Sequence, residues 1–180
     1  MSYAEKRVRV ADFGILPLSS DLLVSVPSVP GMDCKVHVLA ASDLLAMAAE
    51  IKRLLGIEAL IASGCRAHRW ASRAAYEAAM VTQYGSVAEG QRWVAFNSPH
   101  ETGLAVDFGC GGLHPDSKTA IYQRQTLLWA WLHDNAWRFG FTPYLPEPWH
   151  WEHWIPREAW LTGAMPATTE ATATKEEAAT

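Results

Sequence analysis

Hydrophobic positions along this chain follow helical spacing in three long segments. In the first, an apolar stripe recurs every three to four residues, made by Leu44, Leu45, Met47, Ala48, Ile51, Leu54 and Leu55. We expect Ser42 to cap this helix and Gly56 to end it near residue 55. An alanine-rich pattern predicts a second helix over 67–82, and the longest pattern predicts a third over 119–139.

Short apolar runs between these segments predict strands. They span residues 57–62, 104–108, 141–144 and 149–153, and the last two flank a proline-rich turn. We expect a shorter extended piece at 93–96 and one helical turn at 156–161. Prolines prevent a long helix in residues 1–38, which read as an irregular lead-in.

The order of these elements favours an α+β fold. The strands are short and the last two are close in sequence, so we expect a small central antiparallel sheet flanked by helices rather than a doubly wound parallel sheet. Residues 1–165 fit a single domain. The remainder, 166–180, is rich in Ala, Thr and Glu without aromatic residues, which predicts a disordered tail.

Composition narrows the class of protein. Hydrophobic residues make up 49% and charged residues 19%, which is typical of a globular domain. The formal net charge is -4 and no basic stripe occurs, so we expect no nucleic-acid partner. No signal peptide or membrane span is recognisable, which predicts a cytoplasmic product and no membrane partner. Cys34, Cys65 and Cys110 lack zinc or disulfide spacing and read as reduced thiols.

Two polar segments carry the candidate chemistry. In the first, His100 and Asp107 stand seven positions apart; Gly103 permits a sharp turn between them, and the small Ala105 shares a strand face with Asp107. The second segment runs from Glu147 to His153 and contains two carboxylates and two imidazoles. Such side chains are the ligands that zinc prefers.

These residues suggest a zinc site made by His100, Asp107 and His150. Three protein ligands with a fourth position left open are typical of catalytic zinc. Glu147, just before the last strand, would stand where it could accept a proton from water. Within the second segment, Glu152 and His153 are rival ligands, and taken singly each residue could instead be a surface or capping group.

The spacing of these residues resembles a known peptidase family. Ser98-x-His100-x-x-Gly103-x-Ala105-x-Asp107 is similar to the SxHxxGxAxD signature of the VanY-like D-Ala-D-Ala carboxypeptidases and dipeptidases, in the wider group of lysostaphin, D-Ala-D-Ala carboxypeptidase and Sonic hedgehog. Glu147-Pro148-Trp149-His150-Trp151 resembles their ExWHW element, and Ser63-Gly64-Cys65-Arg66 their SGYR segment. Residues 135–141 resemble the helix end before ExWHW.

The resemblance implies a hedgehog/D-Ala-D-Ala peptidase-like fold and specific roles. His100, Asp107 and His150 would hold Zn²⁺. Glu147 would act as general base and acid, Arg66 would stabilise the oxyanion, and Ser98 would help to position the substrate. The implied activity is a zinc metallopeptidase that hydrolyses peptidoglycan stem peptides or muropeptides, foremost as a D-alanyl-D-alanine carboxypeptidase.

Other functions remain open at this point. Cys65, Ala67 and Ala71 depart from the family pattern near the expected substrate end, so a phage-type endopeptidase (endolysin) or a cytoplasmic D-Ala-D-Ala dipeptidase are alternatives. A phage-derived protein would be released to reach the cell wall. Outside the enzyme class, a catalytically silent zinc-binding module is the alternative. No obligate protein partner is evident.

Overall fold

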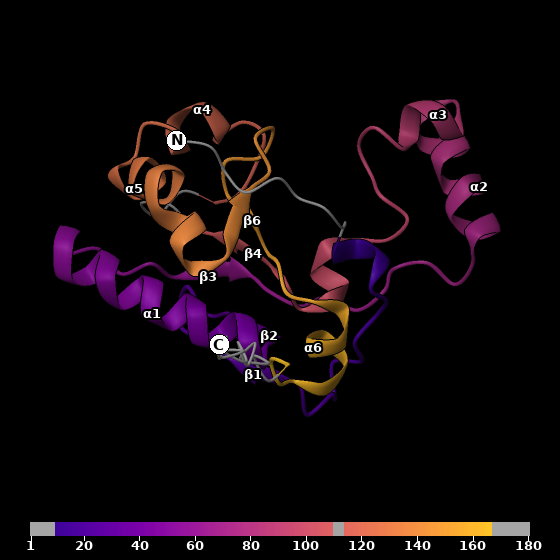
Figure 1. Cartoon of the computed structure of the whole chain (residues 1–180). Helices are drawn as coiled ribbons and strands as arrows, with labels where there is room; N and C mark the ends of the chain where they lie inside the picture. The colour runs from indigo at the N-terminus through magenta and orange to yellow at the C-terminus, as the bar shows by residue number, and fades with distance from the viewer. Residues whose placement is uncertain (1–9, 110–113, 167–180) are drawn as a thin grey trace, which may run out of the picture.

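The computed structural model describes residues 10–109 and 114–166, and it confirms the predicted α+β class (Figure 1). The described strands form two antiparallel sheets, one of two strands and one of four. The predicted disordered tail lies outside the described residues, apart from its first residue. No helix among the described residues is long and apolar enough to cross a membrane.

The larger sheet has the strand order β3-β4-β6-β5. Its strands are β3 (Ile61–Ser63), β4 (Ala105–Phe108), β6 (His150–His153) and β5 (Phe141–Pro143). β4 and β6 are adjacent and antiparallel, with Asp107 opposite His150. The predicted hairpin of the last two strands is therefore confirmed, and β6 also joins β4.

The two faces of this sheet have different side chains. Because successive residues of a strand point to opposite faces, Val106, Phe108 and Trp151 lie in the hydrophobic core while Asp107 and His150 lie on the other face. A second, two-stranded sheet pairs β1 (Leu23–Ser25) with β2 (Lys35–His37), after a 3₁₀ turn at Val10–Asp12.

Helix α1 (Val38–Leu55) packs against the core face of the sheet. It begins four residues before the predicted cap at Ser42, because the side chain of His37 accepts a hydrogen bond from the backbone N–H of Leu39. It ends as predicted at Gly56, whose φ is 68°.

The predicted helix over 119–139 is three shorter helices. They are α4 (Ala120–Gln123), α5 (Leu127–Asn135) and a 3₁₀ turn at Ala136–Phe139. Thr126 interrupts the pattern because its Oγ1 accepts a hydrogen bond from the Trp129 N–H and so starts a new helix. The predicted turn near the C-terminal end is α6 (Arg157–Thr162).

Helices α2 (Arg73–Tyr84) and α3 (Val87–Gly90) form a lobe to one side of the sheet (Figure 1). Ser72 caps α2, so residues 67–71 are irregular and the predicted helix start at 67 is wrong. The prediction of an extended segment at 93–96 is also wrong, since the chain forms turns and irregular backbone after the end of α3.

The burial pattern of α1 gives a stability prediction. Leu44→Ala should lower the free energy of unfolding by about 2–5 kcal/mol, because this side chain is 2% exposed in the core cluster. Its neighbour Leu45 is 47% exposed, so Leu45→Ala should cost about 0.5 kcal/mol or less. Urea denaturation measures both, and equal losses would contradict this orientation of α1.

Candidate metal centre

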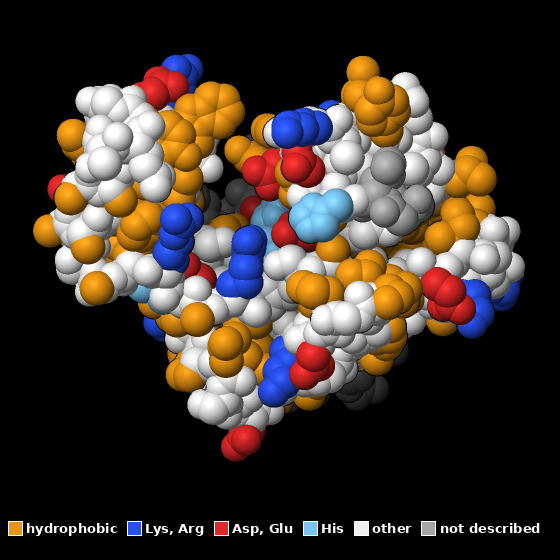
Figure 2. Space-filling model, turned by 180° about the vertical axis from the view of Figure 1, so that it is seen from behind, with side chains coloured by type: hydrophobic (Ala, Val, Ile, Leu, Met, Phe, Trp, Pro, Cys, Tyr) orange, Lys and Arg blue, Asp and Glu red, His pale blue; other side chains and the backbone are white. Residues whose placement is uncertain are grey.

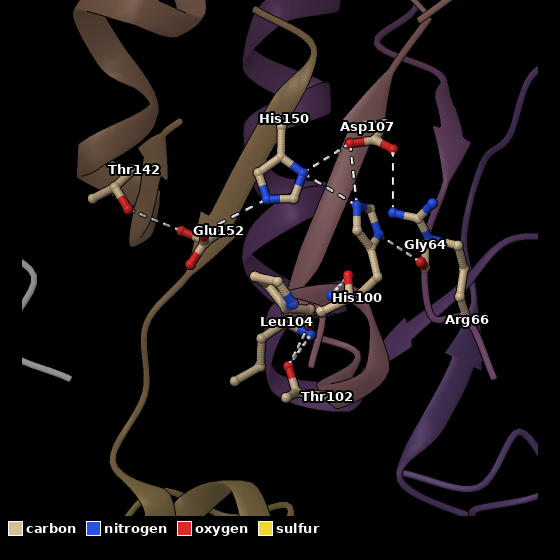
Figure 3. Close-up of polar contacts among 11 residues, drawn as sticks. Gly64, Arg66, His100, Thr102, Leu104, Asp107, Thr142, His150 and Glu152 are labelled. Carbon is tan, nitrogen blue, oxygen red and sulfur yellow. Dashed lines mark hydrogen bonds and ion pairs between the residues drawn. The ribbon is translucent and has the colours of Figure 1, made fainter. Parts of the chain in front are cut away.

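Two imidazoles and a carboxylate converge on the face of the sheet opposite α1 (Figure 3). His100 comes from a 3₁₀ turn at Pro99–Thr102, Asp107 from β4 and His150 from β6. Asp107 Oδ1 lies 3.2 Å from His100 Nε2 and 3.0 Å from His150 Nδ1, and the two nitrogens are 3.1 Å apart. All three residues are buried.

The turn that presents His100 is built by its neighbours. Ser98 caps it by accepting a hydrogen bond from the His100 N–H at 3.3 Å. Gly103 ends it with a φ of 72°, and a Cβ there would lie 2.8 Å from a methyl of Leu23. The predicted need for glycine at this turn is therefore confirmed.

A hydrogen bond to the outer ring nitrogen of His100 and a charged contact at that of His150 orient the two imidazoles. His100 Nδ1 lies 2.8 Å from the carbonyl oxygen of Gly64, which can only accept, so Nδ1 carries the proton and Nε2 presents a lone pair. His150 Nε2 faces Glu152 Oε1 at 3.5 Å, which leaves Nδ1 turned toward Asp107. Such outer partners fix the tautomer of metal-binding histidines.

The surroundings favour the protonation states in which these groups bind metal. Burial lowers the pKa of His100, which keeps the imidazole neutral. Burial by itself would raise the pKa of Asp107, but the contacts of its carboxylate with the ring nitrogens of His100 and His150 outweigh burial and hold this pKa far below its usual range. A metal cation at this point would likewise keep the carboxylate ionised.

The three ligand atoms fit a zinc ion. Zinc–nitrogen distances of about 2.0–2.1 Å in a tetrahedral site put neighbouring ligand atoms roughly 3.3 Å apart. The separations of 3.0–3.2 Å among His100, Asp107 and His150 are close to this value. Two imidazoles and a carboxylate are also the ligand types of catalytic zinc.

An open cleft of about 900 Å³ leads to this cluster. Figure 2 shows the hollow between two lobes, with histidine and acidic side chains at its floor. Its lining includes Arg66, Ser98 and Glu147 besides the three candidate ligands. Arg66 Nη2 lies 3.9 Å from Asp107 Oδ2, with its side chain 55% exposed. The structure thus brings all the predicted site residues to one cleft.

The positions that depart from the family pattern differ in their surroundings. Ala67 lines the cleft. Cys65 packs instead beside a core cluster with Leu22 and Leu39, and burial raises the pKa of its thiol. The departure at Cys65 therefore changes a side chain that packs against the core.

Other histidines have partners that the sequence did not reveal. His153, a rival ligand by sequence, places Nε2 2.8 Å from Asp43 Oδ2 on α1, and Glu152 faces His150. His68 places Nδ1 3.0 Å from Oε2 of the buried Glu101. The pair joins the segment that carries Arg66 to the turn that carries His100.

The sequence is similar to that of a D-alanyl-D-alanine carboxypeptidase of Enterococcus faecalis, with 31% identity over 117 residues. The match covers 54% of this chain and 41% of that protein, so the chain spans about two fifths of the relative's length. The resemblance to D-Ala-D-Ala carboxypeptidases is confirmed. No protein-family model matches the sequence.

Two solved structures are also similar. VanYB in complex with D-alanine-D-alanine is 23% identical, with a TM-score of 0.48 over 84% of this chain and 89% of that one. A vancomycin-resistance D,D-pentapeptidase, VanY, in complex with Zn(II) is 24% identical, with a TM-score of 0.48 over 82% and 86% of the two chains. TM-scores below 0.5 do not establish a shared fold, and the fold described above stands on this chain's own helices and strands.

The placement of Glu152 predicts its effect on metal affinity. Glu152→Gln should weaken zinc binding about 10–100-fold, because the amide loses the charge that faces His150 Nε2. Competition with a chromophoric chelator measures the affinity. Glu58→Gln, at an exposed carboxylate paired with Lys52, is the matched control and should bind zinc as the wild type does. Unchanged affinity in Glu152→Gln would overturn this role.

Proposed function

We propose that this chain is a zinc metallopeptidase that hydrolyses peptidoglycan stem peptides, foremost as a D-alanyl-D-alanine carboxypeptidase. The observation that carries the proposal is the buried convergence of His100, Asp107 and His150 at the floor of an open cleft. The similarity to a D-alanyl-D-alanine carboxypeptidase supports the substrate class. The proposed catalytic unit is a single domain over residues 1–165.

His100, Asp107 and His150 would hold the zinc ion through Nε2, a carboxylate oxygen and Nδ1. Bound zinc supplies Lewis-acid chemistry: it polarises a carbonyl and lowers the pKa of a water toward about 7. Gly64 and Glu152 would keep the two imidazoles oriented for this task.

Glu147 is the proposed general base and acid. It precedes β6, and its backbone carbonyl accepts a hydrogen bond from the His150 N–H at 2.9 Å, which fixes it beside the metal ligands. Glu147 is half-buried and is part of the cleft lining. There it would accept a proton from the attacking water and donate that proton to the leaving nitrogen. The nitrogen would then depart as a neutral amine rather than as an amide anion.

Arg66 and Ser98 would act on the substrate. Arg66 donates its backbone N–H to the His100 carbonyl at 3.3 Å, which ties its position to the ligand turn. Its guanidinium would donate to the oxygen of the scissile carbonyl as negative charge develops there. Ser98, at the cap of the same turn, lines the cleft and would help to position the peptide.

An endopeptidase that cuts within the stem is the second candidate. The cleft is open and holds about 900 Å³, which leaves room for peptide on both sides of the scissile bond. A silent zinc-binding module has less support, since it would need neither Glu147 nor Arg66, and both line the cleft.

The proposed function has a direct test. Zinc-loaded protein should release one D-alanine from a muropeptide that ends in D-Ala-D-Ala, as followed by mass spectrometry. Glu147→Gln should keep its fold and its zinc but lower kcat by about 10²–10⁴-fold, because proton transfer is lost. Glu158→Gln, an exposed carboxylate on α6, is the control and should keep full turnover.

The products distinguish the candidates. Cleavage inside the stem would select the endopeptidase. Bound zinc at unit stoichiometry without any cleavage product would select the silent module. Full hydrolysis by Glu147→Gln would show that another group is the base.

Replacement of Arg66 tests the oxyanion role. Arg66→Ala should lower kcat by about 10²–10³-fold with little change in substrate affinity, because its interaction strengthens only in the transition state. Steady-state kinetics measure kcat, and binding of the substrate to the zinc-free protein measures its affinity, so the two effects can be separated. Arg53→Ala, an exposed arginine on α1, is the matched control. A loss confined to affinity would assign Arg66 to ground-state binding instead.

A further inference from the structure

One wall of the cleft carries aromatic and hydrogen-bonding side chains that the proposed chemistry does not use. The segment that leaves α3 contributes Gln91, Arg92, Trp93 and Asn97 to the lining, and Trp70 lies in the lining from the segment before α2. Figure 2 shows hydrophobic side chains on one of the lobes that border the hollow. The wall therefore belongs to the same cleft as the metal cluster but to a different part of the fold.

Trp93 is the most exposed large hydrophobic side chain of the described residues, at 70%. Its position is nevertheless fixed. The indole Nε1–H donates to Glu89 Oε1 at 3.1 Å, and the other carboxylate oxygen accepts from Arg92 Nη1 at 3.2 Å. An indole that is held by its edge and open on its face presents a flat apolar surface to a ligand.

The backbone under this indole is anchored to α2. Gly90 packs so closely on Met80 that a Cβ there would lie 2.6 Å from it. The buried Tyr76 donates its hydroxyl to the Val94 carbonyl at 2.7 Å. Trp93 stands between these two attachments, so its ring is in place before any ligand arrives, which reduces the entropy cost of binding.

The side chains that line this wall match the chemistry of a sugar. A pyranose ring has an apolar C–H face that stacks on an indole, and its rim carries hydroxyl and acetamido groups. Gln91 and Asn97 offer amides that both donate and accept, and Arg92 offers several donors. A wall that combines an exposed indole with planar polar side chains suits a carbohydrate better than an apolar protein surface.

We propose that this wall binds an N-acetylated sugar of the glycan to which the stem peptide is attached. The inference rests on the proposed function, because the cleft continues from His150 to Trp93 and so would hold peptide and sugar of one substrate together. A cleft of about 900 Å³ suits a ligand larger than a terminal dipeptide. The chain should thus prefer glycan-linked peptide over free peptide.

The test compares two substrates with the same stem, one free pentapeptide and one joined to an N-acetylglucosamine–N-acetylmuramic acid disaccharide. In the zinc-loaded wild type, kcat/KM should be about tenfold higher for the disaccharide form, a modest value for one well-made contact. Trp93→Ala should bring this ratio close to one, and Trp93→Phe should keep most of it. Trp154→Ala, an exposed tryptophan outside the cleft lining, should keep the wild-type ratio.

A second measurement does not depend on turnover. The ¹H–¹⁵N indole signal that is missing in Trp93→Ala should shift when the free disaccharide is added to the wild type. Hydrolysis of both substrates with a ratio of one, and no shift of this signal, would overturn the sugar site while leaving the peptidase intact. Absence of hydrolysis with a clear shift would overturn the peptidase and leave the sugar site. Binding to lipid vesicles that Trp93→Ala abolishes, without a shift on sugar, would assign the wall to a membrane instead.

Discussion

Three lone-pair donors meet in a buried place, and this constraint governs the rest of the structure. His100 Nε2, His150 Nδ1 and an oxygen of Asp107 lie within 3.2 Å of one another, and His100 presents a lone pair at Nε2 because its Nδ1 donates to the Gly64 carbonyl. Only a cation or a shared proton makes such an arrangement favourable away from water. The carbonyl of Gly64 maintains it by holding the proton of His100 on the outer nitrogen. The fold thus presents a cluster of candidate metal-ligand atoms at the floor of the cleft.

The division of the sheet into two faces explains how a small domain accommodates a buried cluster of polar side chains. Val106 and Trp151 alternate with Asp107 and His150, so each strand contributes to the core and to the site at once. The segments that precede α2 and follow α3 line another wall of the cleft, and the main core cluster of the described residues contains no side chain of these two helices. The candidate metal ligands therefore lie on two sheet strands and the adjacent 3₁₀ turn, whereas the proposed sugar-binding wall lies on segments that can vary without disturbing them.

Sequence reasoning succeeded where the information is local. Gly103 predicts a sharp turn and the apolar run over 104–108 predicts a strand, and both are present. It failed where a partner is distant in sequence: Gly64 lies 36 residues from His100, and Asp43 lies 110 residues from His153. It also failed at helix boundaries, where the side chains of His37 and Thr126 cap helices that the apolar stripe alone would start elsewhere. The roles of the site residues remain predictions that this geometry supports.

The pairing of Asp107 with His150 across β4 and β6 has a consequence for how the chain folds. A slip of one residue between these strands would turn one of the two ligands into the core and bring an apolar side chain to the floor of the cleft. Metal would then bind only chains in the native alignment, and binding to the native state alone adds to its stability by mass action. The ion would selectively stabilise the native register of the two strands. Metal supply during synthesis would therefore influence the yield of correctly folded protein as well as its activity.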